Sequence, residues 1–415
     1  MNNNKLKIGL FGYGCVGAGL YEILNRKPSF NASIKSICVK TKGKKRNISD
    51  AHFTYDKYDI LNNESIDVVV ELIDDADEAF IIVSEALQRG KHVVTANKKM
   101  LANHFQTLID LAKENNVSLL YEAAVGGSIP IIRTLEEYYN NDTLTQLDGI
   151  LNGTTNYILT KTLNEQKSYD EVLSEAQALG FAESNPTMDV QAFDPKFKLV
   201  ILLAHAFGVI VKPEQLFNYG IEQLSQYDIR FAKQRDYAIK LVASATIVNH
   251  KIQAFVLPKF VPQNDSFYAV NNEFNAVQVS AAFSDKQLLM GKGAGSFPTA
   301  AAVLSDISAL RYNYAYEYHK LNNYLKPEID NNALIHVYLR YASNDVFEEL
   351  QFETANEEYR SKGYNYIIGS ISLQQLINAD LLKRPDVFVA AIEEVSHQNK
   401  KTTINSTIKL AESIH

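Results

Sequence analysis

The stretch from Ala178 to Ala204 places three carboxylates and Lys198 directly before an apolar run. The carboxylates are Glu183, Asp189 and Asp194, and the apolar run continues past Ala204 as LVILLAHAF. Asp194-Pro195 has the pattern of a helix start, with aspartate as the N-cap and proline at the first helical position. Lys198 then lies one turn into the predicted helix, on the same face as Asp194.

A lysine at this place suits proton transfer. The positive end of the helix dipole disfavours the charged form of Lys198, so the position is a poor one for a merely stabilising cation. An amine whose neutral form is accessible can exchange a proton with a substrate oxygen. Three alternatives stay open: Lys198 is a surface lysine, Asp194 only caps the helix, and Glu183 belongs to a solvated loop.

A glycine-rich turn near the N-terminus indicates a dinucleotide site. An apolar strand over 5–11 leads into Gly12-Tyr13-Gly14-Cys15-Val16-Gly17, and a helical pattern continues to about Asn25. In this context the glycines permit the tight turn, the approach of a pyrophosphate and close packing of helix on strand. The helix N-terminus then faces the phosphates. The alternative is a tight turn that binds no ligand.

The end of the second predicted strand, 33–39, bears on the choice of cofactor. NAD sites usually carry an acid there for the ribose 2′-hydroxyl. This chain has no acid, and five of the seven residues from Lys40 to Arg46 are basic. A basic loop suits a 2′-phosphate, so the sequence favours NADP over NAD, with Lys40 as the contact residue. A solvated basic loop is the alternative.

Strands and helices alternate through the first part of the chain, which predicts a doubly wound parallel sheet. Ligands of such sheets bind at the carboxyl edge, and Lys98 follows a strand at that edge. After the first two strands, the predicted elements are strands at 67–73, 92–95 and 118–121 and helices at 78–88 and 105–114.

Four longer motifs carry a family resemblance. They are GKHVVTANKKMLA (90–102), YEAAVGGSIPIIRTL (121–135), ILNGTTNYILT (150–160) and MGKGAGSFPTAAAVLSDI (290–307). With the glycine-rich turn, they resemble homoserine dehydrogenase over about residues 5 to 315. The resemblance implies NAD(P)H-dependent interconversion of L-aspartate 4-semialdehyde and L-homoserine, in threonine, methionine and isoleucine biosynthesis.

The resemblance also implies a domain order. It predicts an NADP-binding Rossmann domain over 1–132, an α+β dimerisation and substrate domain over 133–300, and a returning helix over 301–320. A small α/β module over 321–415 would follow, with strands at IHVYLRYA and VFVAAIEEV and a helix at SLQQLINA. This module is either a degenerate ACT-like domain or an unrelated one. The glycine turn of an effector-binding ACT domain is missing at 341–345, which argues against threonine feedback.

The resemblance also implies site residues. Lys198 matches the family's general acid/base, and Lys98 matches a second essential lysine near nicotinamide and substrate. Glu183, Asp189 and Asp194 match carboxylates that bind the substrate, with Gly180 and Thr155 beside them; Thr155 is alternatively part of a helix cap. Further cofactor contacts are expected at Thr95 and Gly295.

Two loops carry further expectations. In some family members backbone carbonyls bind Na⁺ at positions that match Glu122, Val125, Gly127 and Ile129, and carbonyl oxygens suit such a hard cation. The family usually has glycines where this chain has Asp74 and Asp75. These carboxylates are expected to alter contacts with the cofactor.

Composition limits the other functions. The net charge of −7 argues against nucleic acid as a partner, and no apolar run reaches the length of a membrane span. With only two cysteines, which cannot form a disulfide framework, a cytoplasmic location is expected. The family resemblance implies a homodimer or larger homo-oligomer. Two other functions stay open: a non-catalytic NADP-binding regulatory protein, and an oxidoreductase for another small carbonyl compound. Retention of Lys98, Glu183 and Lys198 argues against the first.

Overall fold

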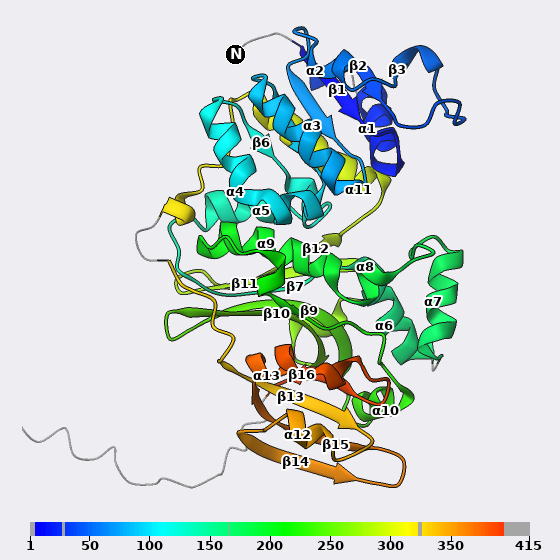
Figure 1. Ribbon diagram of the computed structural model, residues 1–415, viewed down its shortest axis with the longest axis vertical. Helices are drawn as coiled ribbons and strands as arrows, with labels where there is room; N and C mark the ends of the chain where they lie inside the picture. The colour runs from blue at the N-terminus through cyan, green and yellow to red at the C-terminus, as the bar shows by residue number, and fades with distance from the viewer. Residues whose placement is uncertain (1–4, 27–29, 166, 323–325, 394–415) are drawn as a thin grey trace, which may run out of the picture.

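The computed structural model describes residues 5–26, 30–165, 167–322 and 326–393. Its first sheet is parallel and six-stranded, in the order β3-β2-β1-β4-β5-β6 (Figure 1). This order confirms the predicted Rossmann-type doubly wound sheet, and it reverses between β1 and β4, where ligands of such sheets bind. The strands are β1 (Leu6–Phe11), β2 (Ala32–Cys38), β3 (Phe53–Thr54), β4 (Val68–Glu71), β5 (His92–Thr95) and β6 (Leu119–Leu120).

The helices of this part are α1 (Cys15–Arg26), α2 (Tyr58–Leu61), α3 (Ala76–Gln88) and α4 (Lys98–Glu114). The predicted start of α4 at Phe105 was wrong. The helix begins at Lys98, because the side chain of Asn97 caps it by accepting the Met100 N–H. His104 departs from helical geometry (φ −128°, ψ 23°), so α4 is kinked there. The kink separates a short first turn from the longer apolar part that the sequence predicted.

The helix α11 (Ser296–Leu310) returns from the second half of the chain to the first sheet. It packs beside α1 (Figure 1), and Ser296 Oγ donates a hydrogen bond to the Cys15 carbonyl at 2.7 Å. A Cβ atom on Gly19 would lie 2.5 Å from Ser296 Oγ, so glycine is needed for the two helices to approach. The first sheet and its helices are therefore built from two distant parts of the chain.

The second sheet is mixed and runs in the order β12-β11-β7-β9-β10-β16-β13-β15-β14, with β8 paired to β10. Helix α9 lies between the two sheets in Figure 1 and packs against α4 and β9. The strands of its first part are β7 (Leu144–Ile150), β8 (Phe217–Asn218), β9 (Ala238–Val248), β10 (Lys251–Val261), β11 (Phe274–Ala281) and β12 (Asp285–Lys292). The helices are α5 (Ile131–Arg133), α6 (Gly153–Glu165), α7 (Tyr169–Ala178), α8 (Thr187–Val190), α9 (Phe193–Phe207) and α10 (Gln226–Gln234).

The C-terminal part continues this same sheet. In chain order it is β13 (Leu334–Tyr341), α12 (Val346–Glu349), β14 (Thr354–Arg360), β15 (Asn365–Ser372), α13 (Leu373–Asn378) and β16 (Phe388–Ile392). The β-α-β-β-α-β order with neighbours β16-β13-β15-β14 is a ferredoxin-like arrangement. The predicted strands at 335–342 and 387–395 and the helix at 372–379 correspond to β13, β16 and α13; residues 323–325 and 394–415 lie outside the described residues.

A buried ion pair joins this part to helix α10. The Arg340 side chain, 4% exposed, contacts both carboxylate oxygens of Asp228 at 3.0 and 3.1 Å. Arg340 also donates to the carbonyls of Gln223 and Asp386 at 2.7 and 2.9 Å. Because Asp228 lies on α10 and Arg340 on β13, the pair fixes the C-terminal part against the helices of the second sheet.

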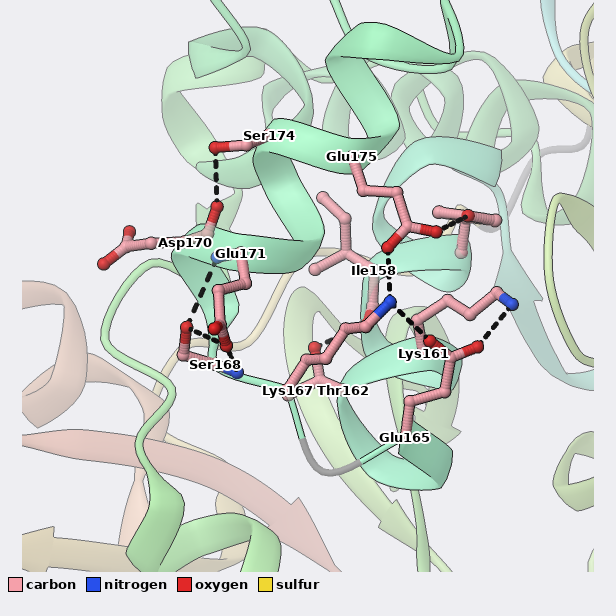
Figure 2. Close-up of polar contacts among 11 residues, drawn as sticks. Ile158, Lys161, Thr162, Glu165, Lys167, Ser168, Asp170, Glu171, Ser174 and Glu175 are labelled. Atoms are coloured by element: carbon pink, nitrogen blue, oxygen red, sulfur yellow. Dashed lines mark hydrogen bonds and ion pairs between the residues drawn. The ribbon is translucent and has the colours of Figure 1, made fainter.

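Polar contacts hold α6 and α7 together on the surface (Figure 2). Lys167 Nζ lies 2.7 Å from a carboxylate oxygen of Glu165 and 2.7 Å from one of Glu175. Ser168 and Glu171 form a capping box at the start of α7. These contacts set the direction of α7, which leads into the acidic stretch before α9. No helix in the described part of the chain is long and apolar enough to cross a membrane.

Candidate active site

Helix α9 presents Asp194 and Lys198 to the space between the sheets. Lys198 Nζ lies 2.7 Å from Asp194 Oδ2, in the i, i+4 relation expected from the sequence. The prediction that Asp194 is the N-cap was wrong: the cap is Ala192 in a left-handed conformation (φ 65°), and Asp194 is the second helical residue. Its carboxylate is therefore directed to the lysines instead of to the first N–H groups of the helix.

Lys198 is held in a buried setting. Its side chain is 9% exposed, and Nζ donates to the Leu151 carbonyl at 2.7 Å as well as to Asp194. Burial lowers the pKa of Lys198, although the carboxylate of Asp194 opposes the shift. The amine is thus close to a carboxylate that stabilises its charged form, in surroundings that favour its neutral form.

Asp194 links this lysine to the first domain. Its other oxygen, Oδ1, lies 3.1 Å from Nζ of Lys98, the first residue of α4. Burial alone would raise the pKa of Asp194, but the two lysines outweigh burial and hold the pKa below its ordinary value. The same ion pair raises the pKa of Lys98. Lys98 and Lys198, far apart in the sequence, thus meet at one carboxylate.

Asn152 belongs to the 150–160 motif, and the structure shows which residues it contacts. Its Nδ2 donates to Asp189 Oδ1 at 2.7 Å and to Asp194 Oδ2 at 2.9 Å, so it joins the two carboxylates. Its Oδ1 accepts the N–H and hydroxyl of Thr155 at 2.8 and 3.0 Å. Thr155 is 1% exposed and lies behind Asn152, which agrees with the helix-cap alternative for its hydroxyl. The available signal was an asparagine three residues before a threonine at a helix start.

Asp189 lies on the short helix α8. Burial and the neighbouring charge of Asp194 raise its pKa. The position of α8 is fixed from the other side, because the Ile221 N–H donates to the Val190 carbonyl at 2.8 Å and Asn218 Nδ2 donates to the Gln191 carbonyl at 2.7 Å. A Cβ on Gly220 would lie 1.8 Å from the Val190 carbonyl oxygen, so only glycine allows this approach.

Glu183 and Gly180 stand apart from this cluster. Both are exposed, and they lie between α7 and α8. Gly180 has a positive φ of 77°. The Glu183 backbone carbonyl accepts a hydrogen bond from Gln177 Nε2 at 3.0 Å. Within the described residues, its carboxylate has no hydrogen bond or ion pair, so it remains available to a ligand.

The glycine-rich turn has the geometry that a dinucleotide needs. Gly12 has a φ of 94°, and a Cβ there would lie 2.4 Å from the Leu72 carbonyl oxygen. A Cβ on Gly17 would lie 2.4 Å from the Gly12 carbonyl oxygen, whereas nothing lies within 4 Å of one on Gly14. Two glycines are thus required for packing, and the third leaves open space beside Cys15 and Val16 at the start of α1. Gly295 caps α11 next to this turn.

The basic loop follows β2 at the carboxyl edge. Lys40 is exposed there. The Arg46 guanidinium binds within the loop, because it donates to the carbonyls of Lys44 and Thr41 at 3.0 and 2.9 Å. The Arg46 guanidinium also lies over the Phe53 ring at 4.8 Å. Arg46 therefore shapes the loop and leaves Lys40 nearest the strand end.

Known proteins match this arrangement. A family model described as the NAD binding domain of homoserine dehydrogenase matches residues 12–122, and one described as homoserine dehydrogenase matches residues 130–308. The homoserine dehydrogenase of Bacillus subtilis (strain 168) is 38% identical over 336 residues, which cover 79% of this chain and 77% of that protein. The chain belongs to the homoserine dehydrogenase family.

Solved homoserine dehydrogenases share the fold. One from Thiobacillus denitrificans has a TM-score of 0.82 and 29% identity, covering 94% of this chain and 98% of its own. A hyperthermophilic archaeal homoserine dehydrogenase, solved with NADPH, has a TM-score of 0.66 and 28% identity, covering 75% of this chain and 99% of its own. Family membership makes the chain an NAD(P)-dependent oxidoreductase that acts on a CH–OH group, and it disfavours the non-catalytic alternative.

The turn expected to bind a cation follows β6 in this homoserine dehydrogenase fold. The Glu122 carboxylate accepts the N–H groups of Ile132 and Arg133 at 2.8 and 3.0 Å, and burial raises its pKa to about 7. The Ile129 carbonyl accepts the Ile131 N–H at 2.8 Å. Among the described residues, no group of three or more His, Cys, Asp or Glu side chains is placed to hold a metal.

A residue that the sequence did not single out is Glu71, at the end of β4. It is 0% exposed, and burial raises its pKa to about 7. The nearby Asp75 caps α3, since its side chain accepts the N–H groups of Asp77 and Glu78. Asp74 remains exposed beside Lys98, whose pKa it helps to raise. The two aspartates that depart from the family pattern thus have different roles.

Proposed function

We propose that Lys198 exchanges the proton with the substrate oxygen when L-aspartate 4-semialdehyde and L-homoserine are interconverted. The observation that carries this proposal is the pairing of one buried carboxylate, Asp194, with both Lys198 and Lys98. A bound nicotinamide dinucleotide supplies or accepts the hydride. In the reducing direction Lys198 donates its proton to the developing alkoxide, and in the oxidising direction it accepts the hydroxyl proton.

The substrate ammonium is proposed to bind among the carboxylates Asp189, Asp194 and Glu183. The support is electrostatic: Asp189 and Asp194 lie on either side of the Asn152 amide, and burial and the charge of Asp194 raise the pKa of Asp189. A cation between the two carboxylates would offset their repulsion. Lys98, with a side chain that is 41% exposed, is proposed to face the substrate and the nicotinamide. Thr95 is 0% exposed and its hydroxyl is bonded to Glu71, so its side chain is not proposed as a cofactor contact. This arrangement favours an amino acid over a carbonyl compound without an ammonium group.

NADP is proposed as the preferred cofactor. The support is the basic loop after β2, in which Lys40 is exposed and no acid stands. Lys40→Ala should raise the KM for NADPH by about tenfold, the value of one charge-assisted contact, and leave the KM for NADH within about twofold. Equal effects on both cofactors would contradict a contact with the 2′-phosphate.

Lys198→Met and Lys196→Met form a matched pair of tests. Both lysines are buried on α9, but Lys196 lies over the Phe193 ring and has no ion pair with a carboxylate within the described residues. With L-homoserine and NADP, Lys198→Met should lower kcat by a factor of about 10² to 10⁴ while NADPH binding is retained. Lys196→Met should stay within about threefold of the wild type. Unchanged kcat in Lys198→Met would refute the assignment.

A homodimer or larger homo-oligomer is proposed through the edge strand β12. Leu288 and Met290 on this strand are 39% and 50% exposed, and Phe283 just before it is 81% exposed. Exposed apolar side chains on a sheet edge favour association with another copy. Light scattering of Met290→Glu should give a smaller mass than the wild type; an unchanged mass would contradict this interface.

Three further expectations are also proposed. Backbone carbonyls of the 122–129 turn are proposed to hold Na⁺, because carbonyl oxygens suit a hard cation. The C-terminal part is proposed to be ACT-like, on the ground of its β-α-β-β-α-β order. The two free thiols, Cys15 and Cys38, are compatible with a proposed cytoplasmic location. Assays with and without Na⁺ and with added threonine test the first two.

A further inference from the structure

The buried carboxylate of Glu71 connects two loops at the carboxyl edge of the first sheet. Its Oε1 accepts the Ile73 N–H at 2.7 Å, in the loop after β4. Its Oε2 accepts the Thr95 hydroxyl at 2.5 Å, at the end of β5. Since β4 and β5 are paired with Glu71 opposite Thr95, both contacts lie at the point where the two strands end.

The Thr95 hydroxyl extends this connection to α4. Because it donates to Glu71, its oxygen is oriented to accept the Asn97 N–H, which it does at 3.0 Å. Asn97 in turn donates from Nδ2 to the Ile73 carbonyl at 3.1 Å and accepts the Met100 N–H at 3.0 Å. The N-cap residue Asn97 is thus bonded to Thr95 and to Ile73, and the Glu71 carboxylate holds both of these partners.

The first turn of α4 depends on this support. The helix is kinked at His104, so its longer C-terminal part does not by itself set the direction of the turn before the kink. Lys98 is the first residue of that turn, and its Nζ reaches Asp194 at 3.1 Å. A shift of the cap would therefore move Lys98 relative to Asp194 and Lys198.

We propose that Glu71 is a positioning residue for the reaction, which acts through Thr95 and Asn97 to hold Lys98 against Asp194. This inference rests on the proposed role of Lys98. Stability alone does not explain an acid at this place, because Glu71 is fully buried and has no ion pair within the described residues, a costly arrangement for a carboxylate. Its two accepted hydrogen bonds make the rigid link between the loops.

The test compares Glu71→Gln, Thr95→Val and Thr95→Ser with Asp148→Asn. Asp148 is a matched control, since it is a buried carboxylate that also accepts a hydroxyl, from Ser244, and an amide, from Gln146, but it lies on β7 of the other sheet. For each full-length variant, kcat/KM for homoserine, the Kd of NADPH and the thermal unfolding midpoint are measured. Lys98→Met is measured alongside.

We expect Glu71→Gln and Thr95→Val to lower kcat/KM for homoserine by about 10- to 100-fold, as for a small misplacement of a reacting group. The Kd of NADPH should change by less than about threefold, and Thr95→Ser, which keeps the hydroxyl, should recover most of the activity. If Glu71→Gln fails to fold, the two Thr95 variants carry the test.

Two results would overturn the inference while leaving the proposed function intact. One is wild-type kcat/KM in Thr95→Val when Lys98→Met has lost activity. The other is an equal loss in Asp148→Asn, which would mark the effect as general to buried carboxylates. Wild-type activity in Lys98→Met would instead remove the proposed role of Lys98, and the positioning role of Glu71 with it.

Discussion

Replacing Asp194 by asparagine tests whether one carboxylate organises both lysines. The change keeps the size of the side chain and removes its charge. Asp194 is 4% exposed, and its oxygens lie 2.7 Å from Lys198 Nζ and 3.1 Å from Lys98 Nζ. Removing one partner of a buried ion pair costs about 3–5 kcal/mol. Most of this cost should come from the unpaired charge of Lys198, because its side chain is 9% exposed whereas that of Lys98 is 41% exposed.

Loss of the proton from the Lys198 amine would remove much of this cost. Burial already lowers the pKa of Lys198 and Asp194 opposes the shift, so the pKa should fall further in Asp194→Asn. Reduction of the semialdehyde requires the protonated amine, and oxidation of homoserine requires the neutral one. The falling limb of the first pH profile and the rising limb of the second should therefore both move to lower pH.

Steady-state kinetics in both directions and urea unfolding across the pH range provide the assay. Turnover near neutral pH should fall by about 10² or more in the reducing direction. The loss of unfolding free energy should shrink as pH rises, because the unfolded chain then binds more protons than the folded variant. The reasoning fails if kcat/KM stays within about threefold of the wild type and unfolding changes by less than about 1 kcal/mol.

Three further changes have defined outcomes. Arg340→Met leaves Asp228, which is 0% exposed, without its cation, so the free energy of unfolding in urea should fall by about 3–5 kcal/mol. Adding Asp228→Asn should recover part of this loss. A loss below about 1 kcal/mol would contradict the pairing. Gly14→Ala should leave the unfolding midpoint unchanged, because nothing lies within 4 Å of the added Cβ. In a titration the same variant should bind NADPH about tenfold more weakly, and unchanged affinity would show that no phosphate approaches Gly14. Burial lowers the pKa of Lys240 to about 8, below its unfolded value of about 10.4. The wild type should therefore gain stability relative to Lys240→Met as pH rises across that range. Unfolding midpoints of the two proteins that change in parallel with pH would refute this.

Local patterns explain the parts of the fold that the sequence predicted. The apolar run DVVVELI and its neighbours predict buried parallel strands, and the glycine-rich turn fixes where the first strand meets its helix. The i, i+4 spacing of Asp194 and Lys198 predicts a shared face wherever the helix starts, so the pair was correct although the N-cap was not.

Contacts between distant segments explain the rest. Glu71 ends an apolar strand, and nothing near it in the sequence shows that its partner is Thr95 on the next strand. The link from Asn152 to Asp189 and Asp194 likewise joins the end of β7 to two later helices. The proximity of Lys98 to Asp194 came from the family resemblance, because periodicity places each lysine on its own element only.

The return of α11 to α1 has a consequence for synthesis. As the chain leaves the ribosome, β1 to β6 and their helices emerge long before Ser296 and its partners on α11 exist. The side of α1 that α11 covers in the folded protein therefore remains exposed until the second sheet up to β12 has been synthesised. Contacts of such long sequence separation slow folding and lengthen the time at risk of aggregation. Nascent chains that stop before Ser296 should bind chaperones more strongly than chains that extend past Leu310.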